Sequence, residues 1–288
     1  MVCPSTQTLK ENSILSSKGM KRVLIILSAI VLLAACRKDS PVYVPEFTTM
    51  TYSVQPPVQF ITKAGEGDKI NVLWYGVYHK KTDDSYVYME DMSAFVEITD
   101  PSDIKVPVTL IRNQEYKLVF VAQHRSMTSQ RTNAYTYNIN YETGDMALNS
   151  PLADGECLDA FVKVDTVGPV LGNENRHITL ERPFAQINIA TSAAVLPDTF
   201  DLTLTGVPAA YNLFTDKCSQ ETISHTFQGL TPIGGTVSVA GTDYRHMTTL
   251  YVFGGKKIGG TISYGSTETT FSHIDTAPNH KTNIVGNI

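Results

Sequence analysis

Apolar and polar residues alternate along short stretches of this chain, with a period of two. Met50, Tyr52 and Val54 are apolar and are separated by polar residues, after which Pro56 and Pro57 end the stretch. This pattern is typical of a β-strand with one buried face. The same alternation recurs at Ile70, Val72 and Trp74, at Val106, Val108 and Leu110, at Tyr116, Leu118 and Phe120, at Ile178 and Leu180, at Ile187 and Ile189, at Phe200, Leu202 and Leu204, at Val237 and Val239, and at Leu250–Phe253. The pattern predicts a fold made of many short strands.

No stretch has the pattern of a long amphipathic helix. Short strands that follow one another without helices are typical of antiparallel β-sandwiches. The polar, glycine-containing stretch 168–175 is the expected boundary between two such sandwiches. We therefore expect an all-β protein with an extended tether at residues 36–47 and two tandem antiparallel β-sandwich domains, at residues 48–172 and 173–288.

The N-terminal region has the layout of a bacterial secretory leader. Met20-Lys21-Arg22 is a short positive segment, and the apolar run from Val23 to Ala35 follows it directly. This run is shorter than the ~20 residues that a membrane-spanning helix needs, so a cleaved signal peptide fits better. The run ends in Leu33-Ala34-Ala35-Cys36, which resembles the lipobox of bacterial lipoproteins. We predict translation from Met20, cleavage between Ala35 and Cys36, and lipidation of Cys36.

A processed lipobox cysteine carries three acyl chains, and stable membrane attachment takes at least two. We therefore expect the chain to be held at a membrane by its N-terminus alone. The chain has a formal net charge of -5 at pH 7 and lacks clustered Lys and Arg, so nucleic acid is not an expected partner. Cys157 and Cys218 match no metal or redox spacing. Two buried free thiols are favoured, and a disulfide between them remains the alternative.

The chain shows no motif for catalysis. Nucleophile elbow, P-loop, zinc-protease and dinucleotide-binding patterns are all absent from the sequence, and its seven histidines are scattered singly. We expect no enzyme activity, no catalytic residue, no metal site and no cofactor.

Tyr135, Tyr137 and Tyr141 form an aromatic cluster with two asparagines among them. Such a cluster could stack on a sugar ring and hydrogen-bond its hydroxyls, which gives a glycan-binding surface lipoprotein as the alternative function. A strand whose tyrosines cover the edge of the core explains the same residues and is the favoured interpretation.

Two further stretches resemble conserved segments of a known family. Leu180–Ile189, which reads LERPFAQINI, is similar to the L-x-R-P-x-A-Q-[LI]-N strand of the fimbrillin-like (type V fimbrial) lipoproteins of Bacteroides and related Bacteroidales. Asn279–Asn287, which reads NHKTNIVGN, is similar to their N-x-R-T-N-I-x-G-N segment. The resemblance implies tandem transthyretin-like β-sandwiches, a lipid-anchored outer-membrane protein exposed at the cell surface, and a structural or adhesive role in a fimbrium.

The resemblance also implies a way of assembling with other fimbrial subunits. In polymerising members, a protease cuts after an arginine that follows the first strand, and a strand of a neighbouring subunit fills the groove by β-strand addition. Here the corresponding strand contains Met50, Tyr52 and Val54, and Lys63 stands where the arginine is expected. Because no arginine occurs between Arg37 and Arg112, we expect an anchor or accessory subunit that keeps its first strand, rather than a shaft subunit.

Overall fold

The structure is a computed structural model that describes residues 44–56, 70–123, 137–151 and 160–287. All of its strands belong to one compact unit that spans residues 46–288. Within the described ranges there is one short 3-10 helix, η3 (Glu90–Met92), and no α-helix. The expected all-β fold is confirmed.

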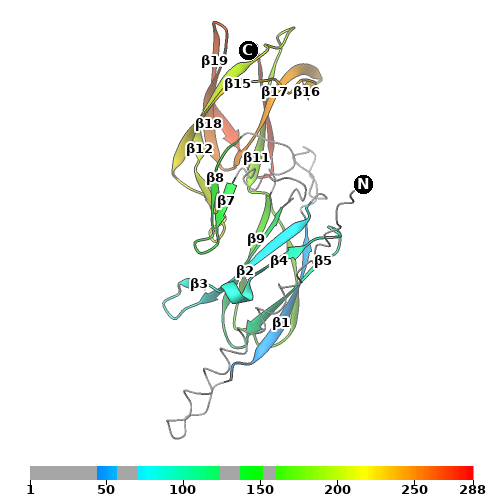
Figure 1. The fold of residues 1–288 in the computed structure, drawn as a ribbon, viewed down its shortest axis with the longest axis vertical. Coiled ribbons are helices and arrows are strands. Elements are labelled where there is room, and N and C mark those ends of the chain that lie inside the picture. Colours follow the sequence, from blue (N-terminus) through cyan, green and yellow to red (C-terminus); the bar gives the residue numbers. More distant parts are fainter. Residues whose placement is uncertain (1–43, 57–69, 124–136, 152–159, 288) are drawn as a thin grey trace, which may run out of the picture. The chain divides into compact units, whose positions relative to one another are not determined.

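The first half of this unit is a sandwich of two sheets (Figure 1). One sheet has the strand order β10 (Glu174–Thr179), β1 (Phe47–Gln55), β5 (Ile104–Ile111). The other has the order β3 (Tyr86–Tyr88), β2 (Val72–Lys80), β6 (Tyr116–Gln123), β9 (Ala160–Val167), with β4 (Ala94–Glu97) paired to β2. Buried side chains of both sheets form the first core cluster between them.

The second half contains two further four-stranded sheets. One has the order β16 (Thr236–Val239), β17 (Thr242–Phe253), β11 (Phe184–Thr191), β20 (Lys281–Gly286), and the other has the order β15 (Thr222–Leu230), β12 (Phe200–Pro208), β18 (Lys256–Tyr264), β19 (Thr267–Thr276). A small fifth sheet joins the halves, with the order β14 (Lys217–Cys218), β13 (Ala210–Asn212), β8 (Asp145–Leu148), β7 (Tyr137–Asn140). Because β8 precedes β9 in the chain and pairs with β13, the two halves are hydrogen-bonded to each other.

The sheet that contains β2 and β6 is buried on both faces. Leu73 and Val77 of β2 belong to the first core cluster, whereas Trp74 and Tyr78 belong to the second, which also contains the buried side chains of the second half. Alternate residues of a strand point to opposite faces, so both sets of positions are apolar. This burial explains why β6 reads YKLVFVAQ, an almost continuous apolar run.

Two strand pairs are parallel, and each joins the first and last strands of one half. β1 pairs in parallel with β10, and β11 pairs in parallel with β20. The other ladders of the described residues are antiparallel, as expected. Residues 174–179 therefore hydrogen-bond to the first half, although the expected division lay between residues 172 and 173. The polar sequence of β10, ENRHIT, gave no signal for this pairing.

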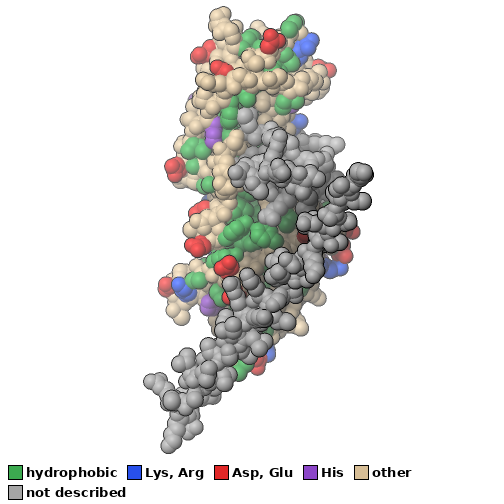
Figure 2. Space-filling view, viewed as in Figure 1, with side chains coloured by type: hydrophobic (Ala, Val, Ile, Leu, Met, Phe, Trp, Pro, Cys, Tyr) green, Lys and Arg blue, Asp and Glu red, His purple; other side chains and the backbone are tan. Residues whose placement is uncertain are grey.

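Aromatic rings gather on the face of this sheet that carries Trp74 and Tyr78. The Trp74 ring lies 4.4 Å from the Tyr141 ring and 6.3 Å from the Tyr88 ring, measured between centroids. Phe95 meets Tyr141 edge-on and is 46% exposed. Figure 2 shows hydrophobic side chains gathered on the visible face midway between the positions of β7 and β2 in Figure 1.

Gly76 leaves the space that the Trp74 ring occupies. A Cβ atom at residue 76 would lie 2.3 Å from Cη2 of Trp74, far inside van der Waals contact. We predict that Gly76→Ala lowers the free energy of unfolding by about 1–3 kcal/mol, the usual cost of overpacking a core. Urea unfolding measures the change. Gly168→Ala is the matched control, because a Cβ there meets no atom within 4 Å. Equal unfolding midpoints for the two variants would show that the Trp74 ring does not pack closely against residue 76.

Three buried tyrosines have hydroxyl groups that resist ionisation. Burial raises the pKa of Tyr52 well above its ordinary value, and the nearby Asp165 carboxylate adds to the effect. Burial likewise raises the pKa of Tyr78. The pKa of Tyr211 is raised by burial and by its hydrogen bond to Asp216. In the unfolded chain these hydroxyls ionise near pH 10.

We predict that the protein loses stability as the pH rises above about 10. The tyrosine pKa values are raised in the folded state, so their contribution is fully present below the unfolded pKa and is lost above it. Each such tyrosine steepens the loss by up to about 1.4 kcal/mol per pH unit. Urea unfolding at a series of alkaline pH values measures the slope. The free energy of unfolding should fall less steeply with pH for Tyr52→Phe than for the wild type. Identical slopes would show that the pKa of Tyr52 is not raised in the folded protein.

Candidate functional site

β1 lies in the middle of its sheet, with one partner on each side. Met50 pairs with Val108 of β5 and with Glu174 of β10. The side chains of Met50 and Tyr52 are 0% exposed, and that of Val54 is 2% exposed. The predicted half-buried strand is thus confirmed, and it begins at Phe47, at the end of the expected tether. Removal of this strand from the mature protein stays a prediction.

Side chains as well as the ladders hold β1 in place. The Tyr52 hydroxyl donates to Oδ2 of Asp165 on β9 at 2.8 Å, and Nη1 of Arg176 on β10 donates to the same oxygen at 2.9 Å. The Tyr52 ring lies 4.8 Å from that of Phe120, between centroids. Near the start of the strand, Thr48 Oγ1 donates to Oδ1 of Asn173 at 2.7 Å. β1 is therefore connected to both sheets of the first sandwich.

The tyrosine cluster does not form one exposed platform. Tyr137 is 3% exposed, its hydroxyl donates to Oε1 of Gln123 at 2.9 Å, and its ring packs against Phe184. Tyr141 is half-buried and packs against Trp74, and Tyr135 lies outside the described residues. Tyr137 therefore lies in the core, as a strand tyrosine that packs on Phe184. Contact of the tyrosine cluster with a glycan stays a prediction.

The two motif stretches that carry the family resemblance lie on paired strands. Asn188 of β11 donates through Nδ2 to Oδ1 of Asn283 of β20 at 2.9 Å, and accepts from Thr249 Oγ1 of β17 at 2.9 Å. Arg182 is only 4% exposed, and its guanidinium group lies 4.9 Å from the centroid of the Phe161 ring of β9. The motif residues thus connect three strands of the second half and the junction between the halves.

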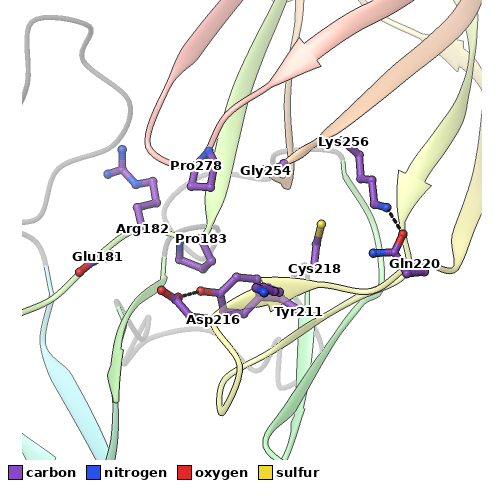
Figure 3. A pocket seen from close by; sticks show the side chains of 12 residues that line it. Glu181, Arg182, Pro183, Tyr211, Asp216, Cys218, Gln220, Gly254, Lys256 and Pro278 are labelled. Atoms are coloured by element: carbon purple, nitrogen blue, oxygen red, sulfur yellow. Dashed lines mark hydrogen bonds between the residues drawn. The ribbon is translucent and has the colours of Figure 1, made fainter. Parts of the chain in front are cut away.

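A half-open cleft of about 300 Å³ lies beside Pro183, at the start of β11 (Figure 3). We call it the junction cleft; it is lined by residues that include Pro183, Tyr211, Asp216, Cys218, Lys256 and Pro278. These residues come from the segment just before β11, from β13, β14 and the turn between them, from the start of β18 and from the loop between β19 and β20. The sequence does not predict this cleft, because no periodic pattern connects segments so far apart in the chain. Its only trace in the sequence is that Pro183 lies in one of the two motifs and Pro278 beside the other.

Charged side chains of both signs line the cleft, with Asp216 and Lys256 on opposite sides of it. The Tyr211 hydroxyl donates to Oδ1 of Asp216. On the other side, Nζ of Lys256 donates to Oε1 of Gln220 at 2.5 Å. Figure 3 shows the Cys218 sulfur between these two pairs. Cys218 is a free, half-buried thiol, whereas Cys157 lies outside the described residues.

Several predicted sites fall outside the described residues. These are the leader with Met20, Ala35 and Cys36, and the cleavage position Lys63. In the described ranges of the chain, no helix has the length and apolar character needed to cross a membrane. The same part of the chain contains no group of three or more His, Cys, Asp or Glu side chains arranged to hold a metal ion.

Solved structures share the fold of this chain. A candidate polysaccharide-binding protein (DUF1812) of Bacteroides thetaiotaomicron aligns with a TM-score of 0.54 and 9% identity, over 83% of this chain and 90% of that one. The fimbrial anchor protein Mfa2 of Porphyromonas gingivalis aligns with a TM-score of 0.51 and 12% identity, over 83% of this chain and 90% of that one. The fold expected from the fimbrillin-like resemblance is therefore confirmed.

Sequence comparison identifies the family. No protein with a curated description matches the chain. Residues 46–288, which include every described strand, match the family described as "Family of unknown function (DUF6562)". The match covers well over half of the sequence, and the chain therefore belongs to the DUF6562 family.

Proposed function

We propose that the chain is a lipid-anchored outer-membrane protein that takes part in a fimbrium or another adhesive surface structure. In this proposal it acts as an anchor or accessory subunit and keeps its first strand. The observation that carries the proposal is the position of β1 in the middle of the first sheet, with Met50 and Tyr52 fully buried. The fold shared with a protein named as a fimbrial anchor supports the same role.

Loss of β1 would leave an apolar groove between β5 and β10. Burial of a side chain such as Met50 or Val54 stabilises a fold by about 1.5–3 kcal/mol, so an empty groove would be costly. A donor strand from a partner can restore the ladder and the side-chain contacts. An Arg-specific protease finds no arginine between Arg37 and Arg112, so it would leave β1 in place. A subunit that keeps β1 fits the end of an assembly better than its repeated shaft.

The lipobox supports the proposed location. Leu33-Ala34-Ala35-Cys36 follows a short positive segment and an apolar run, and Cys36 lies eleven residues before β1 begins at Phe47. A processed Cys36 would carry enough acyl chain for stable attachment to a membrane. The segment between Cys36 and β1 contains Pro41 and Pro45, which suit an extended connection.

The edge of β20 is a suitable place for strand addition by a partner subunit. Within the described part of the chain, β20 has β11 as its neighbour on one side only. Natural edge strands are usually protected by charge, proline, bulges or short length. Other edge strands have such protection: β5 carries Lys105 and Pro107, β9 carries Lys163 and Asp165, and β16 has only four residues. The pairings of β15 with β12 and of β19 with β18 contain register shifts. β20 keeps an unbroken register and is uncharged from Thr282 to Gly286.

We predict that the protein extracted from its native membrane begins at Cys36 and carries three acyl chains. Intact mass and N-terminal analysis measure both properties in one sample. Cys36→Ala is the control, and it should lose the acyl mass and leave the membrane fraction. A species without lipid that begins near Ala64 would show cleavage after Lys63 and would overturn the proposal of a retained first strand.

We also predict that Val285→Pro weakens the association with partner subunits while the fold is kept. The carbonyl group of His280 accepts from Gln186 of β11, and that of Gly286 accepts from Ser192, the residue after β11. Alternate residues of a strand direct their backbone groups to the same neighbour, so the even-numbered residues of β20 face β11. Val285 is odd-numbered and therefore directs its backbone groups to the open edge. A proline there removes a donor from the edge but none from the β11 ladder. Recovery of partner subunits with the variant from native membranes, compared with the wild type, measures the effect.

Ile284→Pro is the contrasting variant, because the backbone of Ile284 faces β11. It should lower the unfolding midpoint, whereas Val285→Pro should leave that midpoint close to the wild-type value. Unchanged partner recovery with folded Val285→Pro protein would exclude strand addition at β20.

A further inference from the structure

We propose that the junction cleft binds an uncharged saccharide of one or two sugar units. Its volume of about 300 Å³ lies at the lower end of the range for ligand sites, which selects a small ligand. The inference is independent of the fimbrial proposal, because it rests on the geometry of this cleft alone.

The polar groups of the cleft favour hydroxyl groups over charged groups. Asp216 and Lys256 lie on opposite sides of the cleft, and the lining also includes the acidic Glu181 and the basic Arg182 and Lys217, so charges of both signs surround it. A ligand with a net charge would meet a like charge on one of these sides. A hydroxyl group both donates and accepts hydrogen bonds, so a ligand with several hydroxyls satisfies both sides at once. This chemistry is that of a neutral sugar.

The apolar residues of the cleft suit the C–H faces of a sugar ring. Pro278 is exposed and offers such a surface at the opening, and the largely buried rings of Pro183 and Tyr211 complete the apolar part of the lining. Figure 3 shows these rings around the same opening as the Cys218 sulfur. A site with apolar surfaces and a few convergent polar groups is the usual design of a small-molecule site.

The cleft is built from groups that are held in place before a ligand arrives. Tyr211 is 4% exposed and stacks on Phe253, with 5.7 Å between ring centroids. A Cβ at Gly254 would lie 2.3 Å from the backbone nitrogen of Pro278, so the turn before β18 packs directly on the loop before β20. Groups that are already ordered lose little conformational entropy on binding, which favours recognition of a small ligand.

The test is saturation-transfer NMR on the full-length protein with a panel of neutral sugars. The panel contains glucose, galactose, mannose, N-acetylglucosamine and their common disaccharides, with sialic acid as a charged comparison. We expect saturation transfer to at least one neutral sugar and weaker or no transfer to sialic acid. Absence of transfer to every neutral sugar overturns the proposal, and so does a preference for sialic acid.

Substitutions at the two sides of the cleft locate the binding. Asp216→Asn removes the charge, keeps an acceptor for the Tyr211 hydroxyl and tolerates the positive φ of 57° at this position. Lys256→Met removes the ammonium group and keeps the length of the side chain. Each variant should weaken binding by about tenfold, the effect of losing one charged hydrogen bond.

Lys257→Met is the matched control for Lys256→Met. Lys257 is the next residue of β18, is exposed, and pairs with Asp275 on β19 at 3.5 Å. Its substitution should leave sugar affinity unchanged. Equal effects of Lys256→Met and Lys257→Met, in proteins with the same unfolding midpoint, would show that the sugar binds elsewhere.

Cys218 offers a second, independent measurement. Its thiol lines the cleft, so a bound sugar should slow its alkylation by iodoacetamide. At a sugar concentration of about ten times Kd, the alkylation rate should fall about tenfold, because few clefts are empty. Peptide mass spectrometry reads Cys218 separately from the other cysteines. An unchanged alkylation rate at saturating sugar would exclude binding in this cleft.

Discussion

The burial of one sheet on both faces is the constraint on which the rest of the structure depends. The sheet with β2 and β6 supplies one wall of the first core, and its opposite face joins the second core through Trp74, Tyr78, Val119 and Val121. Because the two cores share this sheet, the second half packs directly on the first. The small sheet formed by β7, β8, β13 and β14 adds backbone hydrogen bonds across the same junction. The junction cleft exists because segments of the second half converge beside this contact.

The alternation of apolar residues correctly located most of the strands, because alternation reports which side chains of a strand share a face. β1, β5 and β12 are examples in which the predicted apolar positions are the buried ones. Alternation carries no information on which strand lies next to which. The parallel neighbours β1 and β10 are more than a hundred residues apart, and β10 is polar, so its place beside β1 was not predictable from its own sequence.

The candidate site was predictable only where the residues lie close together in the chain. The first strand was found because Met50, Tyr52 and Val54 belong to one run. The tyrosine cluster was also local, yet a local pattern does not reveal whether another element covers a ring, and Phe184 covers Tyr137. The junction cleft draws its lining from residues as distant as Pro183, Tyr211 and Pro278. Asn188 and Asn283 stood out in the sequence only through the family resemblance of their two motifs, and the structure adds that each is the hydrogen-bond partner of the other.

The position of β1 also decides how the protein carries mechanical load. β1 is hydrogen-bonded along its length to β5 on one side and β10 on the other, and it is the first described strand of the chain. A force on the chain ahead of Phe47, directed along the strand, loads both ladders in shear, so their hydrogen bonds must break together rather than one after another. The clamp of Tyr52, Asp165 and Arg176 resists the same displacement. A strand held in this way is a strong point of attachment for a protein that is pulled from its N-terminal end.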